Sequence, residues 1–401
     1  MGFHQNQVQR LKEELKARFV GGEEILDTLV LNQLHRRSTT LIRAPRGTGK
    51  STLMLLVLRG LCGDDMVVIS GASEVKRGEV IGRLHIPSLE KNGVERVLWA
   101  AFTKARGKGL DEVNRLNPYT TANIHHMMQF GEVWAYGQRA QVGDYVIVAN
   151  ENPMDPTTFI HPPPFYDRFD ICVFLRSLTL REKFRLQSLL EKYEGEIVSS
   201  MPQVISQEEL EAIRKEVQEV ELSPELMGAI NIIIRDFQVC IRGRDQSELK
   251  PPALCDGCHF TREVCSRLKE PPSERAVVVL TELAKAKTWL EGKCEVEDLL
   301  EMALWVLPHR TTLVNVRSMV GDLRDLLNRE RAKMSEREVR REWPILNRLY
   351  KEFDRALYQH AKEIAMEDMV FAEELRALEE VWIQEGRLRK DETVGAIVDW
   401  K

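Results

Sequence analysis

The chain has 401 residues, enough for two or three domains, with 43% hydrophobic residues, 30% charged residues and a formal net charge of −5. This composition is typical of a soluble protein, and the negative balance argues against a dedicated nucleic-acid binder, although a local basic patch could hide within the average. No apolar run approaches the roughly 20 residues that cross a bilayer, and the first residues lack the apolar core of a secretory signal. We therefore expect a cytoplasmic protein without membrane contact, whose cysteines are reduced.

The first part of the chain alternates predicted helices and strands. In chain order we expect helices over 5–19 and 23–37, a strand over 39–43, a helix over 52–58, and strands over 66–70 and 145–150. This alternation predicts a parallel sheet covered on both faces. Past about residue 177 helical patterns dominate, and for 314–390 a helical domain with a solvated charged face is preferred to a specialised surface.

A phosphate-cradling loop joins the strand over 39–43 to the next helix. Glycines let backbone N–H groups approach the oxygens of a triphosphate, Lys50 can reach its β and γ phosphates, and the Ser51 hydroxyl can ligate Mg²⁺. We expect ATP as the ligand; a chance match is disfavoured by the position between a strand and a helix. The residues expected to hold ATP in this segment are Ala44, Pro45, Arg46, Gly47, Thr48, Gly49, Lys50, Ser51 and Thr52.

Asp111 and Glu112 form the acidic partner that such a loop needs. One carboxylate can hold Mg²⁺ through water while the other polarises the attacking water. Acid pairs are common, so this signal is weak by itself. The preceding residues 105–110 read Ala-Arg-Gly-Lys-Gly-Leu, which is too polar and too rich in glycine for a central strand. We expect either a short, irregular strand there or the loss of one or two residues relative to related chains, which puts the metal geometry and hydrolysis in more doubt than nucleotide binding.

The order of short motifs resembles the MoxR branch of the AAA+ ATPases, which is related to the magnesium-chelatase motor subunit. The resemblance covers roughly residues 15–312 and rests on motifs that are individually short but occur in a specific order. They are Gly21-Gly22-Glu23-Glu24, the phosphate loop, Asp111-Glu112-Val113-Asn114-Arg115, the stretch 127–133 that leads into a β-hairpin, Ala149-Asn150-Glu151-Asn152-Pro153, Tyr166-Asp167-Arg168-Phe169, Pro272-Ser273-Glu274-Arg275-Ala276 and Val306-Leu307-Pro308-His309-Arg310.

The resemblance implies roles for three further residues. Asn152 would orient the lytic water, Arg168 would act in trans on a neighbouring subunit's nucleotide, and Arg275 would sense nucleotide from a helical lid. Without the resemblance, both arginines would be read as surface charges. The implied fold class is α/β, an AAA+ P-loop core with a parallel sheet followed by an all-α lid and a helical C-terminal segment. The expected parts are an N-terminal helix (1–20), the nucleotide-binding domain (21–178), the lid (179–312, with a cysteine insertion at 240–270) and a helical C-terminal domain (313–401).

The function implied by the resemblance is ATP hydrolysis in a homo-oligomeric, hexameric ring that remodels or activates a partner protein in the manner of a chaperone. A partner of the von Willebrand factor A type is implied on the same ground. Two alternatives remain open: a nucleotide-dependent switch or scaffold with negligible hydrolysis, motivated by the polar residues before Asp111, and an ATPase that acts on nucleic acid.

Four cysteines, outside the reach of the resemblance, have a metal-ligand spacing of C-x14-C-x2-C-x6-C. The x2 pair can direct two thiolates at one ion, so Cys240, Cys255, Cys258 and Cys265 predict a zinc site or a [4Fe–4S] cluster. In a zinc site His259 could replace one cysteine, and the alternative is four free cysteines in a small core. The other three cysteines, in apolar segments, are expected to be core residues: Cys62, Cys172 and Cys294.

Overall fold

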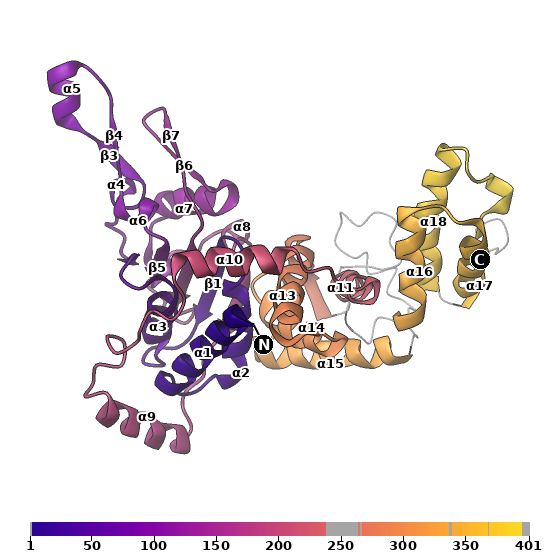
Figure 1. The fold of residues 1–401 in the computed structure, drawn as a ribbon, viewed down its shortest axis with the longest axis horizontal. Coiled ribbons are helices and arrows are strands. Elements are labelled where there is room, and N and C mark those ends of the chain that lie inside the picture. Colours follow the sequence, from indigo (N-terminus) through magenta and orange to yellow (C-terminus); the bar gives the residue numbers. More distant parts are fainter. Residues whose placement is uncertain (1, 238–263, 265–266, 337–338, 368, 395–401) are drawn as a thin grey trace. The chain divides into compact units, whose positions relative to one another are not determined.

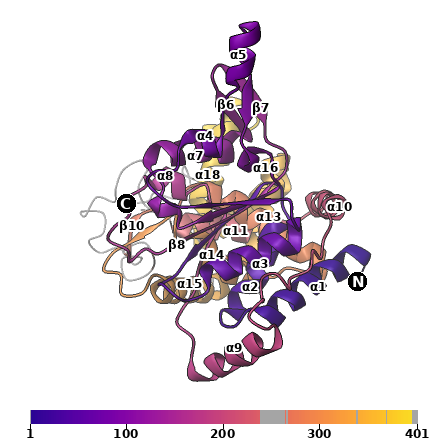
Figure 2. The same cartoon turned by 90° about the vertical axis from the view of Figure 1, so that its left-hand side faces the viewer.

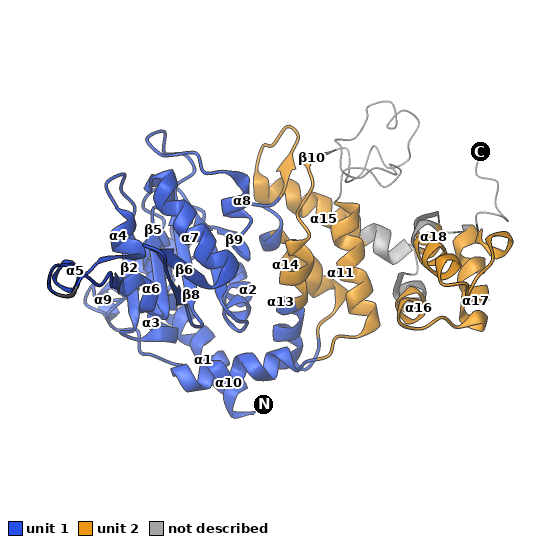
Figure 3. Cartoon of the chain, turned by 90° about the horizontal axis from the view of Figure 1, so that it is seen from above, with its two compact units in different colours: residues 1–220, 282–293, 305–310 blue, residues 221–281, 294–304, 311–401 orange. Residues whose placement is uncertain are grey.

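The computed structural model describes residues 2–237, 264, 267–336, 339–367 and 369–394. The chain divides into two compact units (Figure 3), unit 1 with residues 1–220, 282–293 and 305–310, and unit 2 with residues 221–281, 294–304 and 311–401. Within the described residues, no helix has the length and apolar character to cross a membrane.

A five-stranded parallel sheet forms the centre of unit 1, with strand order β2-β5-β8-β1-β9 (Figure 1). The strands are β1 (Ser38–Arg43), β2 (Met66–Ser70), β5 (Gly107–Asp111), β8 (Val146–Glu151) and β9 (Ile171–Phe174). The predicted α/β fold with a parallel sheet is therefore confirmed. Because all five strands run the same way, their carboxyl ends share one edge, which is where ligands bind in open α/β sheets.

Helices cover both faces of this sheet (Figure 2). On one face lie α1 (Phe3–Arg18), α2 (Glu23–Gln33) and α3 (Lys50–Cys62); on the other lie α6 (Ala101–Lys104) and α7 (Pro118–Phe130). Leu41, Leu110 and Ile147 of the strands are buried in one core with Ile124 and Met127 of α7. Burial on both faces agrees with the fully buried β8, whose first four residues are Val146, Ile147, Val148 and Ala149.

Two hairpins extend away from the sheet in both views (Figures 1 and 2). The first pairs β3 (Gly82–Leu84) with β4 (Val97–Trp99) and carries α5 (Ile86–Asn92) between them. The second pairs β6 (Glu132–Ala135) with β7 (Gln138–Gln141), as the stretch 127–133 predicts. The chain turns from α7 into β6 at Gly131, which has a φ of 67° that favours glycine.

The strand before Asp111 corrects an expectation: β5 is regular and central, paired along its length with β2 and β8. The glycines are required by packing, since a Cβ on Gly107 would lie 2.7 Å from Met66 Cβ and one on Gly109 2.8 Å from Val68 Cγ2. Lys108 is fully buried, and its ammonium donates to the carbonyls of Phe102 (2.5 Å), Thr103 (3.2 Å) and Ala105. A polar sequence therefore builds this central strand, because glycines fit against α3 and the lysine caps α6.

The rest of the chain is mostly helical, as expected. Unit 2 also holds a two-stranded antiparallel sheet, β10 (Leu268–Glu270) with β11 (Thr312–Leu313), which helical periodicity does not predict. Helix α9 (Leu180–Lys192) and helix α10 (Gln207–Gln218) belong to unit 1, and α13 and α14 contribute residues to both units. The remaining elements are α4 (Arg77–Val80), α8 (Pro163–Tyr166), α11 (Pro224–Asp236), α13 (Arg275–Glu291), α14 (Val296–Val306), α15 (Met319–Glu336), α16 (Val339–Lys351), α17 (Arg355–Glu367), α18 (Met369–Gln384) and the 3₁₀ turns 113–115 and 390–392.

Candidate active site

The phosphate loop connects β1 to α3 at the carboxyl edge of the sheet. Gly47 and Gly49 have φ values of 76° and 85°, and a Cβ on Gly47 would meet nothing within 4 Å. Thr48 Oγ1 donates to the Pro45 carbonyl at 2.9 Å, which holds the turn closed. The loop ends at the N-terminus of α3, where unpaired N–H groups and the helix dipole favour an anion. This arrangement can cradle the phosphates of a nucleotide.

Asp111, at the end of β5, lies directly against the start of α3. Its Oδ1 accepts hydrogen bonds from Ser51 Oγ at 2.7 Å and from Asn150 Nδ2 at 2.6 Å. A hydroxyl beside a carboxylate is the oxygen donor set that Mg²⁺ prefers, so these residues fit the ion that accompanies ATP. Asn150 Oδ1 also accepts from the Glu112 backbone N–H at 3.0 Å. Asn150, which the sequence reasoning passed over in favour of Asn152, therefore joins both acidic residues.

Glu112 has a left-handed backbone, with φ 52° and ψ 54°, a conformation uncommon for a residue with a side chain. Its carboxylate lies 3.8 Å from Lys50 Nζ and 2.8 Å from Arg115 Nη1. The turn that follows β5 thus places Glu112 beside the phosphate loop, in reach of the lysine expected to contact the phosphates.

Arg115 continues these contacts to Asp155, a second residue that the sequence reasoning did not select. Asp155 Oδ2 accepts from Arg115 Nη2 at 2.7 Å and from Arg46 Nη2 at 2.8 Å, while its Oδ1 accepts from Thr157. Hydrogen bonds from Arg115, Thr157 and Arg46 hold the pKa of the Asp155 carboxyl well below its usual range. The Asp155 hydrogen bond is also the main cause that raises the pKa of Arg115. No sequence motif signals Asp155, because its role depends on where the loop after β8 folds.

Asn152 lies one residue beyond β8, at the same edge as the phosphate loop. Its Oδ1 accepts from the Met154 backbone N–H at 3.2 Å and its carbonyl accepts from Asn114 Nδ2 at 3.0 Å. Within the described residues, Asn152 has no hydrogen bond to Asp111 or Glu112, unlike Asn150. Its role as the residue that orients water remains a proposal.

Arg168 lies at the opposite edge of the sheet. Its carbonyl accepts from Thr39 Oγ1 at 2.9 Å, near the beginning of β1, and its Nε donates to His125 Nε2 at 3.0 Å. The five residue-to-residue steps from Thr39 to Ala44 span about 17 Å at roughly 3.3 Å per step, so Arg168 is far from its own chain's phosphate loop. Arg275 is the first residue of α13 and belongs to unit 2.

A cavity of about 340 Å³ adjoins the phosphate loop within unit 1. The cavity is lined by Gly47, Thr48, Gly49 and Thr52, by the apolar residues Phe19, Val20, Leu178, Leu186, Leu190, Ile197 and Val198, and by Arg18, Gly195 and Glu196. A largely apolar pocket next to a phosphate cradle suits the base of a nucleotide, which has flat apolar faces and polar edges. Helix α9 contributes Leu186 and Leu190.

The predicted four-cysteine metal site lies outside the described residues, since Cys240, Cys255, Cys258 and Cys265 all belong to segments left out of the description. In the parts of the chain that the structure describes, no group of three or more His, Cys, Asp or Glu residues could hold a metal ion. The other three cysteines are buried and form no disulfide within the described residues, which confirms them as core residues: Cys62, Cys172 and Cys294. Burial raises the pKa of Cys172 to about 12, as expected for an unreactive core thiol.

Comparison with known families addresses the part of the chain that holds this site. Residues 40–169, from β1 to the turn before β9, match the family model described as the AAA domain of the dynein-related subfamily. This region of the chain is similar to an AAA domain. The match spans the phosphate loop, Asp111, Glu112, Asn150 and Arg168.

A solved structure extends the similarity in fold beyond the AAA domain. The crystal structure of a candidate ATPase from Cytophaga hutchinsonii matches with a TM-score of 0.65 and 18% sequence identity, covering 82% of this chain and 95% of that chain. At this identity the match shows a shared fold. No curated protein matches the sequence. The AAA domain and its helical continuation thus agree with the predicted AAA+ architecture.

Proposed function

We propose that this chain is a MoxR-like AAA+ ATPase that hydrolyses ATP in a homo-oligomeric ring and uses the energy to remodel or activate a partner protein. The observation that carries the proposal is the set of contacts among Ser51, Asp111, Asn150 and Glu112 beside the phosphate loop. Binding of ATP is supported by the similarity of residues 40–169 to an AAA domain. The ring, the partner protein and the roles of single residues are parts of the proposal.

The residues divide the work of phosphoryl transfer. Ser51 and Asp111 would hold Mg²⁺, which would supply positive charge to neutralise the phosphates. Lys50 binds the β and γ phosphates, and Glu112 accepts a proton from the attacking water. Asn150 fixes both acidic residues through its side-chain amide. The doubt about hydrolysis rested on an irregular strand before Asp111, and the regular β5 removes that reason for favouring a switch or scaffold.

The position of Arg168 is an argument for assembly into a ring. Catalysis of phosphoryl transfer needs positive charge at the departing γ-phosphate, and Arg168 lies at the edge of the sheet away from its own loop. It can therefore serve only a neighbouring subunit's nucleotide. We propose a hexameric ring on the resemblance in motifs, with Arg275 in the lid as a second nucleotide sensor.

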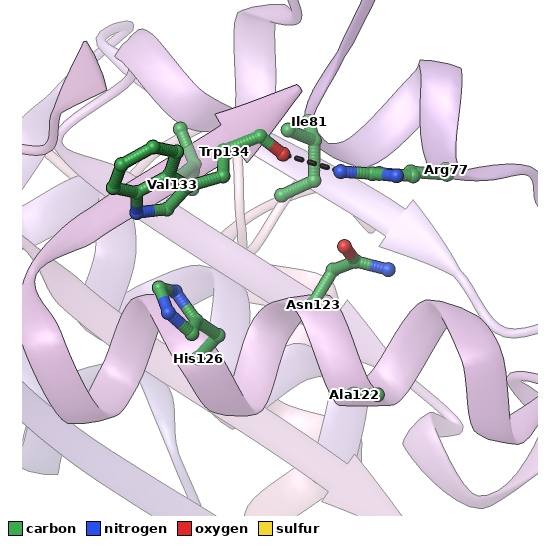
Figure 4. A pocket seen from close by; sticks show the side chains of 7 residues that line it. All are labelled: Arg77, Ile81, Ala122, Asn123, His126, Val133 and Trp134. Carbon is green, nitrogen blue, oxygen red and sulfur yellow. Dashed lines mark hydrogen bonds between the residues drawn. The ribbon is translucent and has the colours of Figure 1, made fainter. Parts of the chain in front are cut away.

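The two hairpins are the proposed contact with the partner protein. They expose the large apolar side chains of Ile86, Leu89, Val94, Leu98, Trp134 and Tyr136. Between α4, α7 and β6 a second cavity of about 400 Å³ is lined by Arg77, Ile81, Ala122, Asn123, His126, Val133 and Trp134. In Figure 4, Trp134 lies across the cavity from His126, and Arg77 donates to the Trp134 carbonyl.

The chemistry of this cavity favours an acidic and apolar polypeptide segment. Its lining holds Arg77 but no carboxylate, and within the described residues Arg77 makes no ion pair. An apolar side chain can pack on Trp134 while a neighbouring carboxylate pairs with Arg77. A partner of the von Willebrand factor A type is proposed on the resemblance in motifs.

ATP turnover by the purified chain tests the enzymatic half of the proposal. Wild type should release phosphate from ATP with Mg²⁺, and Lys50→Ala and Glu112→Gln should each lower turnover at least a hundredfold, with Glu112→Gln still binding ATP. Equal phosphate release by wild type and both variants would contradict the proposal.

Stimulation by β-casein, an acidic and largely unfolded protein, tests the partner half. Casein should increase wild-type turnover, and Trp134→Ala should remove this increase while keeping basal turnover. Phe184→Ala changes another exposed aromatic residue, on α9, away from the hairpins and outside the lining of the cavity beside the phosphate loop; it is the control and should keep the increase. Absence of stimulation, or stimulation that survives in Trp134→Ala, would contradict the proposed contact.

Action on nucleic acid remains the second candidate, motivated by the cysteine insertion and by the helical segment near the C-terminus, which is rich in Arg and Lys but carries as many Asp and Glu residues. Salt-sensitive binding of DNA or RNA would support it, and its absence would remove it.

A further inference from the structure

Five charged side chains in unit 1 form a continuous series that begins and ends in the phosphate loop. The charges alternate in sign from Arg46 to Asp155 (2.8 Å), Arg115 (2.7 Å), Glu112 (2.8 Å) and Lys50 (3.8 Å). We call these five residues the charge chain. Both loop cations are thus paired with carboxylates, and the proposed catalytic base, Glu112, is paired with two cations, Arg115 and Lys50.

The side chains of Asp155 and Arg46 differ in how freely they can move. The Asp155 side chain is only 1% exposed, and its second oxygen is fixed by the Thr157 N–H at 3.0 Å and hydroxyl at 2.6 Å. The Arg46 side chain is 68% exposed and reaches Asp155 from the loop itself. A triphosphate in the loop would compete for Arg46 and Lys50, because phosphate oxygens attract guanidinium and ammonium groups strongly. Arg46 would leave, and Asp155 would stay.

We propose that Asp155 and Arg115 are positioning residues that withhold Glu112 from the attacking water until a triphosphate occupies the loop. The inference rests on the proposed function and concerns the same site. Without a nucleotide, Asp155 pairs with both Arg46 and Arg115, and Arg115 also pairs with Glu112. When phosphate draws Arg46 away, Asp155 attracts Arg115 alone, and Glu112 loses both of its cationic partners, Arg115 to Asp155 and Lys50 to phosphate.

This exchange of partners makes hydrolysis depend on the correct ligand. While the two side chains are paired at 2.8 Å, the Arg115 guanidinium occupies a carboxylate oxygen of Glu112 that would otherwise bind the attacking water. Release of Arg115 frees this oxygen only when phosphates already neutralise Arg46 and Lys50. Arg115 therefore restrains the base, and Asp155 removes the restraint.

Two substitutions have opposite expected effects on the single-turnover rate of ATP hydrolysis. Arg115→Gln removes the grip on Glu112 and should raise the rate about fivefold, with ATP affinity within about twofold of wild type. Asp155→Asn leaves Arg115 on Glu112 and should lower the rate about fivefold, yet it frees Arg46 and should tighten ATP binding about threefold. Binding is measured with a fluorescent ATP analogue, so this readout does not depend on hydrolysis.

The double variant Arg115→Gln with Asp155→Asn decides the order of action. It should hydrolyse ATP at the rate of Arg115→Gln alone, because Asp155 acts through Arg115. Arg36→Gln is the control: Arg36 pairs with Asp144 at 2.6 Å at the other edge of the sheet and should leave rate and affinity unchanged.

The inference is wrong if Arg115→Gln slows hydrolysis, or if Asp155→Asn weakens ATP binding, as a merely structural role would predict. Should Asp155→Asn fail to fold, the sign of the Arg115→Gln effect still decides. Failure of the proposed function has a different signature, since wild type and Glu112→Gln would then release phosphate equally.

Discussion

The two edges of the central sheet carry different parts of the proposed chemistry. At the carboxyl edge, Lys50, Ser51, Asp111 and Glu112 come within hydrogen-bond or ion-pair reach of one another or of Asn150. At the amino edge, Arg168 contacts Thr39 and His125. The residues that follow it are held by Arg310, whose guanidinium donates to the carbonyls of Phe169 and Asp170.

Under the proposed function, this difference leaves one copy of the chain with an incomplete site. A strand is a rigid spacer, so no side-chain rotation brings Arg168 across the sheet to its own loop. The amino edge of one subunit must face the carboxyl edge of the next for the arginine to act. ATP hydrolysis would then occur only in assembled subunits, and substitutions at the two edges should affect it to different extents.

Arg168→Ala should have the largest effect among changes at the amino edge. Loss of an arginine that stabilises the transition state typically lowers phosphoryl transfer about a thousandfold or more, and ATP affinity should change little because the residue is far from the subunit's own loop. Turnover and nucleotide binding are measured on the same samples. Arg36→Ala, at the same edge, is the control, and a loss of turnover there comparable with Arg168→Ala would contradict a specific role.

Asn150→Ala should have a smaller effect at the carboxyl edge. Asn150 donates to Asp111 and accepts from the Glu112 N–H, so its loss should lower kcat about tenfold to a hundredfold with a smaller change in KM. Asn152→Ala, in parallel, compares the residue that the structure places against the acid pair with the one that the motif resemblance implies. Wild-type kcat in Asn150→Ala would show that the contacts seen here are not used.

Lys108→Met should change stability and its pH dependence rather than chemistry. Burial lowers the pKa of Lys108 to about 8. Between this value and the ordinary lysine pKa of roughly 10.4, the unfolded chain binds the proton and the folded chain does not. Folding stability from this group therefore rises as pH increases across that window.

The variant also leaves three carbonyls without their donor. At pH 7 we expect it to lower the free energy of unfolding by about 1–3 kcal/mol, and the difference from wild type should grow between pH 8 and 10. Urea unfolding at several pH values measures both quantities. A difference that is constant with pH would show that Lys108 does not titrate in this range.

The sheet could be predicted from the sequence wherever side chains alone determine the pattern. The apolar runs of β1, β2 and β8 alternate with helical segments, and the glycines of the phosphate loop identify the edge that binds phosphate. The strand β5 was misjudged because its glycines and its lysine make sense only against specific neighbours, Met66, Val68 and the carbonyls of α6. A single sequence does not display those contacts.

The residues of the site could likewise be predicted only where a local motif identifies them. Lys50, Ser51, Asp111 and Glu112 belong to motifs whose spacing reflects their chemistry, so they could be selected in advance. Asn150, Arg115 and Asp155 act through contacts between strands and loops that are distant in the sequence. Of these three residues, Asn150 was the easiest to predict, because β5 and β8 are adjacent strands and their carboxyl ends lie together once the strand order is known.

A subunit-mixing experiment tests the central claim, that one site is built from two edges of two subunits. Glu112→Gln lacks the base but keeps Arg168, whereas Arg168→Ala keeps the base, and each alone should be nearly inactive. In rings formed from equal amounts of both, about a quarter of the sites join an intact base to an intact arginine by random placement in a cyclic assembly, so turnover should recover to about a quarter of wild type. A mixture that assembles and stays as inactive as its two components would contradict the account.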